Sequence, residues 1–221
     1  MFPNLEKRNA ESLTHQRRFV AAVGRQWIKA RKHDPYYRRA KAMAYRSRAA
    51  FKLLQIQSRF HLVQRGDAVV DLGAAPGGWS QIAADLVGRE GRVAAVDLVA
   101  MSPIEGVEVL RGDLRDASTQ AIVLERLGRP ADVVVCDAAP KLSGVRSLDQ
   151  ARAIELARVA LDLAGRALRP GGSFVAKAFR GSDYNGLLAD VAARFASVKE
   201  YTPPASPKGS AEVFIVGLGR L

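Results

Sequence analysis

The sequence has little cysteine, little histidine and no long apolar run. Its 221 residues include one cysteine, Cys136, so no disulfide can form within the chain, which favours a reducing compartment such as the cytoplasm. The three histidines, His15, His33 and His61, lack the spacing of a metal site. No stretch approaches the roughly 20 apolar residues that span a bilayer, and the first residues lack the apolar region of a signal peptide. We therefore expect a cytoplasmic protein that binds no metal and no membrane.

Acidic residues are scarce in one part of the chain only. Residues 1–65 carry 16 lysines and arginines against three acids, an excess larger than the net charge of +12 of the whole protein, so the remainder is close to neutral. Aromatic side chains such as Trp27 and Tyr45 are interspersed among these cations. The combination is typical of a surface that binds a polyanion, and we expect it to contact RNA, with Arg46 and Arg48 among the contacts. A solvated charged segment is the alternative.

The composition predicts one main domain with an extension. A chain of this length with 48% hydrophobic residues can bury a full core. Residues 1–33 are expected to be a basic, partly disordered extension, and residues 34–221 a single domain. Within that domain, residues 34–66 are expected to form a basic helical segment and residues 67–221 the catalytic core. The sequence does not reveal the oligomeric state; we expect a monomer.

Two helices are expected in the basic helical segment. Asp34 and Pro35 are typical of a helix start, with the aspartate as the capping residue and proline at the first helical position. That helix should run to about Ala42. Ser47 is expected to cap a second helix over residues 48–56.

From residue 67 onward, short apolar runs alternate with segments of helical periodicity. The expected strands cover residues 68–71, 92–97, 107–110, 132–136, 172–177, 198–201 and 211–218, and the expected helices residues 78–87, 117–127, 148–168 and 184–195. Such alternation predicts a parallel sheet with right-handed crossovers and helices on both faces. Only a proline-rich loop separates the last two strands, so they should form an antiparallel hairpin. We expect an α/β protein with a Rossmann-like, mostly parallel seven-stranded sheet.

The stretch Asp71-Leu-Gly-Ala-Ala-Pro-Gly-Gly-Trp-Ser-Gln81 joins a strand to a helix. Gly73 allows a tight turn, and Gly77 and Gly78 are expected to let a ligand lie against the main chain, where any Cβ would collide. The loop has no lysine or arginine and lacks the third glycine of the dinucleotide-binding pattern. The pattern therefore disfavours a diphosphate, and with it a nicotinamide-dependent oxidoreductase.

Further carboxylates end the next two strands. Asp97 comes twenty residues after Gly77, where an acid can accept hydrogen bonds from both hydroxyls of an adenosine ribose. Asp113 follows the next apolar run and could meet an exocyclic amine such as adenine N6. The alternative is that both acids only cap strand ends or helix starts. Together with the glycine turn, they favour an adenosine-containing ligand at the carboxyl edge of the sheet.

Two lysines and two acids are expected to pair at the same edge. Asp137 ends a buried strand, and Lys177 lies in an apolar strand, where an unpaired lysine would be costly. Asp137 is its natural partner. Glu212 opens the last apolar strand, and Lys52 is available to meet it. The alternative is two unrelated ion pairs.

These stretches, with residues 46–53, together resemble the FtsJ/RrmJ (RlmE) family of S-adenosylmethionine-dependent ribose 2′-O-methyltransferases, from about Trp27 to the C-terminus. The resemblance implies a catalytic tetrad of Lys52, Asp137, Lys177 and Glu212. It also implies that S-adenosylmethionine is contacted by Gly77, Trp79, Asp97, Asp113 and Asp137.

The resemblance further implies a target, a uridine in the aminoacyl-tRNA-binding loop of large-subunit ribosomal RNA. Ala138 and Lys141 stand where the family often has methionine and asparagine, and the stretch before Glu212 lacks the arginines of many bacterial members. These departures concern the target more than the reaction. A tRNA 2′-O-methyltransferase, or a non-catalytic RNA-binding or ribosome-assembly protein on the same scaffold, remains the alternative.

A ribose hydroxyl is a very weak acid, so methyl transfer to it needs alignment and a group that accepts its proton. Lys177 is the best candidate for that acceptor, and it must be neutral when it takes the proton. Asp137 is expected to orient Lys177. Whether proton removal or positioning dominates stays open at this point.

Overall fold

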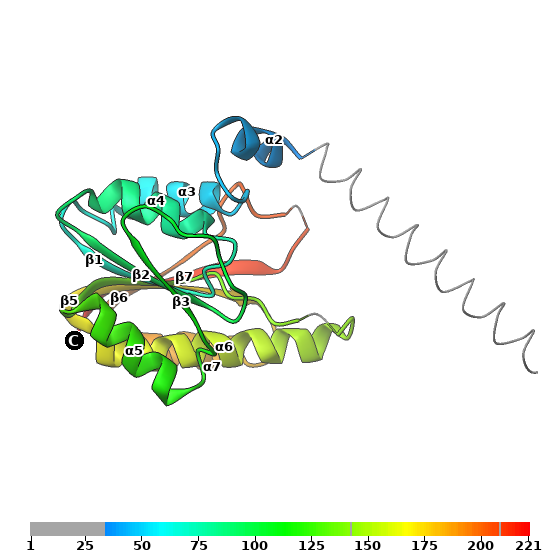
Figure 1. The fold of residues 1–221 in the computed structure, drawn as a ribbon. Coiled ribbons are helices and arrows are strands. Elements are labelled where there is room, and N and C mark those ends of the chain that lie inside the picture. Colours follow the sequence, from blue (N-terminus) through cyan, green and yellow to red (C-terminus); the bar gives the residue numbers. More distant parts are fainter. Residues whose placement is uncertain (1–33, 142, 208) are drawn as a thin grey trace, which may run out of the picture. The chain divides into compact units, whose positions relative to one another are not determined.

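The computed structural model describes residues 34–141, 143–207 and 209–221 (Figure 1). The extension expected over residues 1–33 lies outside the described residues. The chain divides into two compact units, Met1–Ala44 and Tyr45–Leu221, and each is described by itself. The division falls inside the domain expected from residue 34 onward.

The described part of the first unit contains helix α2 (Pro35–Ala42). The Asp34 carboxylate accepts hydrogen bonds from the backbone N–H groups of Tyr36, at 2.9 Å, and Tyr37, at 3.3 Å. Two of the donors that a helix start leaves without a partner are thereby satisfied, and Pro35 has no N–H to satisfy. The helix start predicted from Asp34 and Pro35 is confirmed.

The second unit alternates helices and strands around one seven-stranded sheet. Its elements are α3 (Ala50–Phe60), β1 (Ala68–Leu72), α4 (Gly78–Val87), β2 (Arg92–Asp97), β3 (Val107–Arg111), α5 (Ala117–Leu127), β4 (Ala131–Cys136), α6 (Arg146–Ala167), β5 (Leu168–Phe179), α7 (Tyr184–Ala192), β6 (Phe195–Tyr201) and β7 (Glu212–Arg220). The strand order is β3-β2-β1-β4-β5-β7-β6, and only β7 pairs antiparallel, with β5 and with β6. The predicted fold class, including the C-terminal hairpin, is confirmed.

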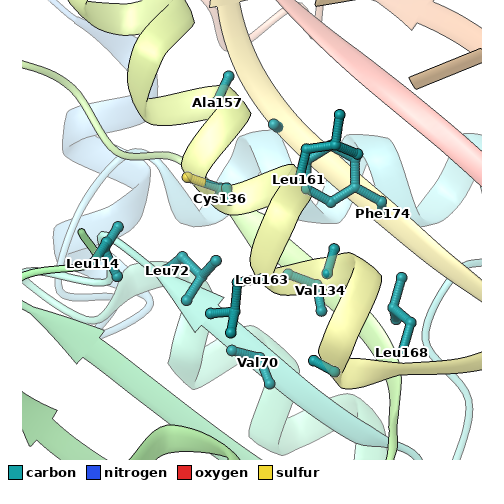
Figure 2. Close-up of a cluster of buried hydrophobic side chains, with 14 of the residues drawn as sticks. Val70, Leu72, Leu114, Val134, Cys136, Ala157, Leu161, Leu163, Leu168 and Phe174 are labelled. Carbon is teal, nitrogen blue, oxygen red and sulfur yellow. The ribbon is translucent and has the colours of Figure 1, made fainter. Parts of the chain in front are cut away.

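Helices cover both faces of the sheet, with α3 and α4 on one face and α5, α6 and α7 on the other (Figure 1). Both central strands, β1 and β4, are buried along their whole length, as expected for parallel strands covered on two sides. Figure 2 shows one of the two core clusters, in which Leu161 of α6 packs with Val134 and Phe174 of the sheet. None of the helices in the described residues is long and apolar enough to cross a membrane.

Strand β5 begins earlier than the sequence predicts. It starts at Leu168, which pairs with Ala131, and the register then shifts before Val133 pairs with Ser173. This irregularity takes residues 169–171 into the strand; they were expected to form a loop because they include proline and glycine. A Cβ at Gly172 would lie 3.0 Å from two backbone carbonyl oxygens, so the close approach of the neighbouring backbone requires glycine here.

The predicted cap of the second helix is wrong. Helix α3 begins at Ala50, its first turn has no side-chain cap, and it extends to Phe60 rather than to residue 56. The Ser47 hydroxyl is buried against the start of α4 instead, where a Cβ on Gly78 would lie 2.3 Å from it. Ser47 is therefore used in tertiary packing, which overrides its local preference for a helix start.

Candidate active site

The charged residues predicted from separate strands meet at the carboxyl edge of the sheet. Asp71, Asp97 and Asp137 lie at or just after the ends of β1, β2 and β4, which run parallel. Lys177 lies near the end of β5. Because β7 runs in the opposite direction, its first residue, Glu212, reaches this same edge, opposite Phe179 of β5. The antiparallel strand is thus what brings the second acid to the site.

Lys52, Asp137, Lys177 and Glu212 form one connected cluster, named here the tetrad. The Lys177 ammonium lies 2.9 Å from Asp137 Oδ1 and donates a hydrogen bond of 2.7 Å to the Asp137 carbonyl oxygen. Lys52 Nζ lies 2.8 Å from Glu212. A distance of 3.8 Å between Lys52 Nζ and Asp137 Oδ1 joins the two pairs. The two ion pairs predicted from the sequence are therefore present and adjacent.

The tetrad is largely withdrawn from water. Its side chains are 7–14% exposed, so the two cations and two anions are costly to bury unless they satisfy one another. Ser206 donates a hydrogen bond of 2.6 Å to Glu212, and Lys52 Nζ lies 5.4 Å from the centre of the Phe214 ring. Ser206 was not expected from the sequence, because it approaches the tetrad from the loop between β6 and β7.

A cavity of about 300 Å³ opens beside Asp137, and it is named here the first cavity. Its lining includes three of the five residues implied to contact the methyl donor, namely Asp97, Asp113 and Asp137. Gly77 and Trp79 are not among its lining residues. The full lining is Gly73, Ala75, Asp97, Leu98, Val99, Asp113, Leu114, Arg115, Asp137, Ala138, Ala139 and Leu156.

Gly77 and Trp79 face the protein rather than the first cavity. A Cβ on Gly77 would lie 2.6 Å from Ile104 Cδ1 and 3.1 Å from Arg46 Cδ. The Trp79 side chain is 2% exposed, and its indole N–H donates a hydrogen bond of 2.8 Å to the Ala49 carbonyl oxygen. The backbone φ of 105° at Gly77 favours glycine whatever side chains lie nearby, and contact of Gly77 and Trp79 with the methyl donor stays a prediction.

The acids of the first cavity are held in fixed orientations. Asp97 accepts hydrogen bonds from the backbone N–H groups of Ala75, at 2.9 Å, and Val99, at 2.8 Å, so it joins the glycine turn to the loop after β2. Asp113 forms a bidentate ion pair with the Arg115 guanidinium, in which Arg115 Nη2 lies 2.6 Å from Asp113 Oδ2. Hydrogen bonds from the Arg115 side chain and backbone N–H lower the pKa of Asp113.

The apolar part of this cavity was not expected from the sequence. Leu98 and Val99 are 59% and 63% exposed although they are large and apolar, and Leu156 of α6 also lines the cavity. The exposed pair directly follows Asp97, which was the available signal. Apolar surface between carboxylates suits a ligand with a planar ring and polar groups at its rim, such as an adenosine.

Asp71 lies behind the site and is fully buried. One of its carboxylate oxygens accepts a hydrogen bond of 2.6 Å from the Ser80 hydroxyl, and the other has no hydrogen-bond partner. Burial, and to a smaller extent the negative charges of Asp137 and Asp97, raise the pKa of Asp71 to about 7. The folded protein therefore favours the protonated form of this acid more than the unfolded chain does.

Arg46 and Arg48 each hold a loop of the protein. The Arg46 guanidinium donates hydrogen bonds to the carbonyl oxygens of Pro76, at 3.4 Å, Ser102, at 2.7 Å, and Pro103, at 2.6 Å. The Arg48 guanidinium donates to the carbonyl oxygen of Ala205. Both guanidinium groups are thus engaged within the protein, and contact with RNA by these two side chains stays a prediction.

A Rossmann-like sheet with a cavity lined by carboxylates at its carboxyl edge defines the class of nucleotide-type α/β enzymes to which methyltransferases belong. The sequence profile of the FtsJ-like methyltransferases matches residues 45–220, and this chain belongs to that family. It is 51% identical over 184 residues to the ribosomal RNA large subunit methyltransferase E of Methanothrix thermoacetophila, covering 83% of this chain and 71% of the relative. The relative of the same name from Methanothermobacter thermautotrophicus is 45% identical, covering 88% of this chain and 93% of the relative.

Solved structures agree on the fold. A Plasmodium falciparum protein described as a ribosomal RNA methyltransferase matches with a TM-score of 0.70 at 24% identity, covering 80% of this chain and 99% of that chain. The methyltransferase MycE, crystallised with Mg and SAH, matches with a TM-score of 0.51 at 18% identity, covering 77% of this chain and 47% of that chain. The Rossmann-like methyltransferase fold predicted from the sequence is confirmed.

Proposed function

We propose that this protein transfers the methyl group of S-adenosylmethionine to the 2′-hydroxyl of a ribose in RNA. The proposed target is a uridine in the aminoacyl-tRNA-binding loop of large-subunit ribosomal RNA. The observation that carries the proposal is the buried tetrad of Lys52, Asp137, Lys177 and Glu212 beside a cavity lined by carboxylates. The names of the relatives, which identify them as ribosomal RNA large subunit methyltransferases, support the choice of RNA.

The lining of the first cavity fits the methyl donor. Asp97 has the carboxylate oxygens to accept hydrogen bonds from ribose hydroxyls, and Asp113 can accept one from the adenine amine. Leu98 and Val99 offer apolar surface to the adenine ring. Bound there, S-adenosylmethionine would supply an electrophilic methyl group on a positively charged sulfur, and the carboxylate of Asp137 at the cavity wall favours such a charge.

The tetrad residues have distinct roles in this proposal. Lys177, as the neutral amine, accepts the proton of the ribose hydroxyl as the oxygen–carbon bond forms and the sulfur–methyl bond breaks, so no free alkoxide is required and neutral S-adenosylhomocysteine leaves. Asp137 orients the Lys177 nitrogen through the two contacts of 2.9 and 2.7 Å and stabilises the ammonium that forms once the proton has been taken. Lys52 and Glu212, paired at 2.8 Å, hold the hydroxyl and keep the site free of loosely bound water. A hydroxyl held in this way is aligned for attack along one direction.

The RNA is proposed to bind through the basic N-terminal part of the chain as well as at the tetrad. The excess of cations over residues 1–65 would contribute affinity that depends on salt and not on sequence. Ribosomal RNA as the target also agrees with the cytoplasmic location that is predicted from the single cysteine. RNA binding by this segment and a monomeric state stay predictions.

The proposal is tested by offering labelled S-adenosylmethionine and the purified protein three acceptors in parallel. The acceptors are undermethylated ribosomal large subunits, free ribosomal RNA and tRNA. Label on ribosomal RNA, mapped to one ribose, is the expected result. Label on tRNA alone would keep the reaction and replace the target. Absence of label on all three RNAs, with measurable donor binding, would favour the non-catalytic alternative.

A further inference from the structure

A second cavity, of about 340 Å³, lies at the carboxyl edge, where β5 ends and β7 begins. Three segments that are far apart in the sequence contribute to it: the start of α6 with the loop before it, the end of β5, and the loop before β7. Its lining residues are Gly144, Arg146, Asp149, Gln150, Phe179, Gly209 and Ala211. The volume lies within the range of roughly 300–1,000 Å³ typical of small-ligand sites.

Its position follows from the strand register. Phe179 lies two residues after Lys177 on β5 and pairs directly with Glu212 of β7. Ala211, which also lines the cavity, directly precedes Glu212. The first cavity is lined by residues that follow β1 to β4, and Asp137 is part of its wall. Asp137 of the tetrad thus borders the first cavity, and chain neighbours of Lys177 and Glu212 border the second, so a methyl donor in the first would lie near an acceptor in the second.

Phe179 is unusual among the aromatic residues of the sheet. It is half-buried, and it belongs to neither of the two core clusters formed by the residues that the structure describes. An aromatic ring that contributes little to the core and lines a cavity offers a stacking surface. Base–aromatic stacking tolerates any base, because every base has an aromatic face.

The polar groups of the second cavity suit a nucleotide. Arg146 is exposed at its rim and forms no ion pair with the residues that the structure describes. The Asp149 carboxylate accepts hydrogen bonds from the N–H and hydroxyl of Ser143, at 2.8 and 2.7 Å, and from Gly144, so it shapes the loop. Gln150 donates a hydrogen bond of 2.9 Å to the Arg180 carbonyl oxygen, which ties α6 to the end of β5. The guanidinium of Arg146 is thus the group suited to a phosphate.

We propose that the second cavity binds the acceptor nucleotide, with its base stacked on Phe179 and a neighbouring phosphate held by Arg146. The inference rests on the proposed ribose methylation, which it deepens by assigning the acceptor a position. A base held there keeps its ribose at the mouth of the cavity, beside Lys177 and Glu212. Phe179 is a substrate-binding residue in this account, and the four tetrad residues retain their roles.

The test compares Phe179→Ala, Phe179→Leu and Phe179→Tyr with the wild type. Phe60→Ala is the matched control, because Phe60 is also a half-buried phenylalanine and lies eight residues after Lys52, about 12 Å further along α3. Three quantities are measured: the Kd for a fluorescent single-stranded RNA in the presence of S-adenosylhomocysteine, the Kd for S-adenosylmethionine, and the KM and kcat of methyl transfer. Phe179→Leu guards against a folding defect, since it keeps most of the volume and removes the aromatic face.

We expect Phe179→Ala and Phe179→Leu to weaken RNA binding about tenfold, as loss of one base–aromatic stack does, and to raise the KM for RNA by a similar factor. The Kd for S-adenosylmethionine should stay unchanged, and Phe179→Tyr and Phe60→Ala should behave as the wild type. In addition, Arg146→Gln should lower the slope of the salt dependence of RNA binding by about one.

Unchanged RNA binding in Phe179→Ala would overturn the inference, as would an equal loss of S-adenosylmethionine binding, which would assign the second cavity to the donor. The proposed function can fail while the inference about the second cavity stands. If the wild type methylates none of the RNAs offered but Phe179→Ala still weakens RNA binding, the second cavity stands as a nucleotide site and the methylation proposal does not. If the wild type binds no RNA, both are overturned.

Discussion

The two cavities that flank the tetrad are built in different ways. The first draws nearly all its residues from consecutive strands and the loops directly after them, and two of its acids are held by groups within three residues or by the glycine turn. The second is assembled from the start of α6, the end of β5 and the loop before β7, which lie far apart in the sequence. A site made of local loops can be recognised from a short motif. A site made of distant segments becomes visible only when the sheet has formed.

The largest expected effect is on the rate of methyl transfer, and it distinguishes the roles of Lys177 and Asp137. Lys177→Ala should lower single-turnover methyl transfer by about 10²- to 10⁴-fold, the usual contribution of a proton-transfer group, and leave the Kd for S-adenosylmethionine unchanged. Asp137→Asn should impair both, because Asp137 lines the first cavity and also holds Lys177. The measurements are rapid-quench transfer and calorimetric titration of the donor, with Lys199→Ala on the edge strand β6 as the control. If Lys177→Ala and Asp137→Asn bind S-adenosylmethionine equally well, the separate roles assigned to these two residues are wrong.

The Lys52–Glu212 pair ties helix α3 to the start of β7. Lys52→Ala should lower the free energy of unfolding by about 3–5 kcal/mol, because it leaves the buried Glu212 carboxylate with the Ser206 hydroxyl alone. The double variant Lys52→Met with Glu212→Leu should recover most of that loss while remaining inactive. Urea unfolding checks both. A double variant less stable than Lys52→Ala would contradict this account of the pair.

Asp71, behind the first cavity, predicts a dependence of stability on pH. Its pKa is about 7 in the folded protein and near the ordinary aspartate value of 3.8 in the unfolded chain, so between about pH 4 and 7 the folded state holds a proton that the unfolded state has lost. The cost of ionising buried Asp71 therefore lowers the free energy of unfolding as the pH rises. Asp71→Asn should therefore gain stability relative to the wild type as the pH rises from 4 to 7, by about 4 kcal/mol for a pKa difference of about three units, and the difference should stay level above pH 7. Urea unfolding at several pH values measures this difference. If the free energies of unfolding of Asp71→Asn and the wild type run parallel with pH, as expected for the exposed Asp85→Asn, the prediction is wrong.

Arg46 and Arg48 give the smallest expected effects, and they compare the donor cavity with the proposed RNA cavity. Arg46 holds the glycine turn and the loop before β3, and Arg48 holds the loop before β7. Arg46→Gln should raise the Kd for S-adenosylmethionine up to about tenfold, the effect of losing about 1.4 kcal/mol of binding, and leave RNA binding alone. Arg48→Gln should do the reverse. If both variants instead flatten the salt dependence of RNA binding with no change in donor affinity, these arginines contact RNA directly, as first expected from the sequence.

Sequence patterns predicted the features that follow from topology. The pairing of Lys177 with Asp137 was predictable because adjacent parallel strands end at one edge, and the meeting of Lys52 with Glu212 followed from charges that had to be buried. The start of α2 was predictable because the capping contacts of Asp34 are local.

The directions of side chains could not be predicted in the same way. Trp79 turns into the core, Ser47 packs against Gly78, and Phe179 is among the residues that line the second cavity. Each of these orientations depends on which distant segment lies opposite. Periodicity and spacing along one chain carry no such information, so the lining of the second cavity was not expected from the sequence.

The most direct test of the central claim is the chemical position of the transferred methyl group. Ribosomal RNA labelled by the wild-type protein would be digested with alkali, which cleaves only next to a free 2′-hydroxyl. The account predicts that the label is recovered in an alkali-resistant dinucleotide, because the acceptor is a ribose oxygen held at the tetrad. Label recovered in a single nucleotide would place the methyl group on a base and contradict the roles assigned to Lys177 and its partners.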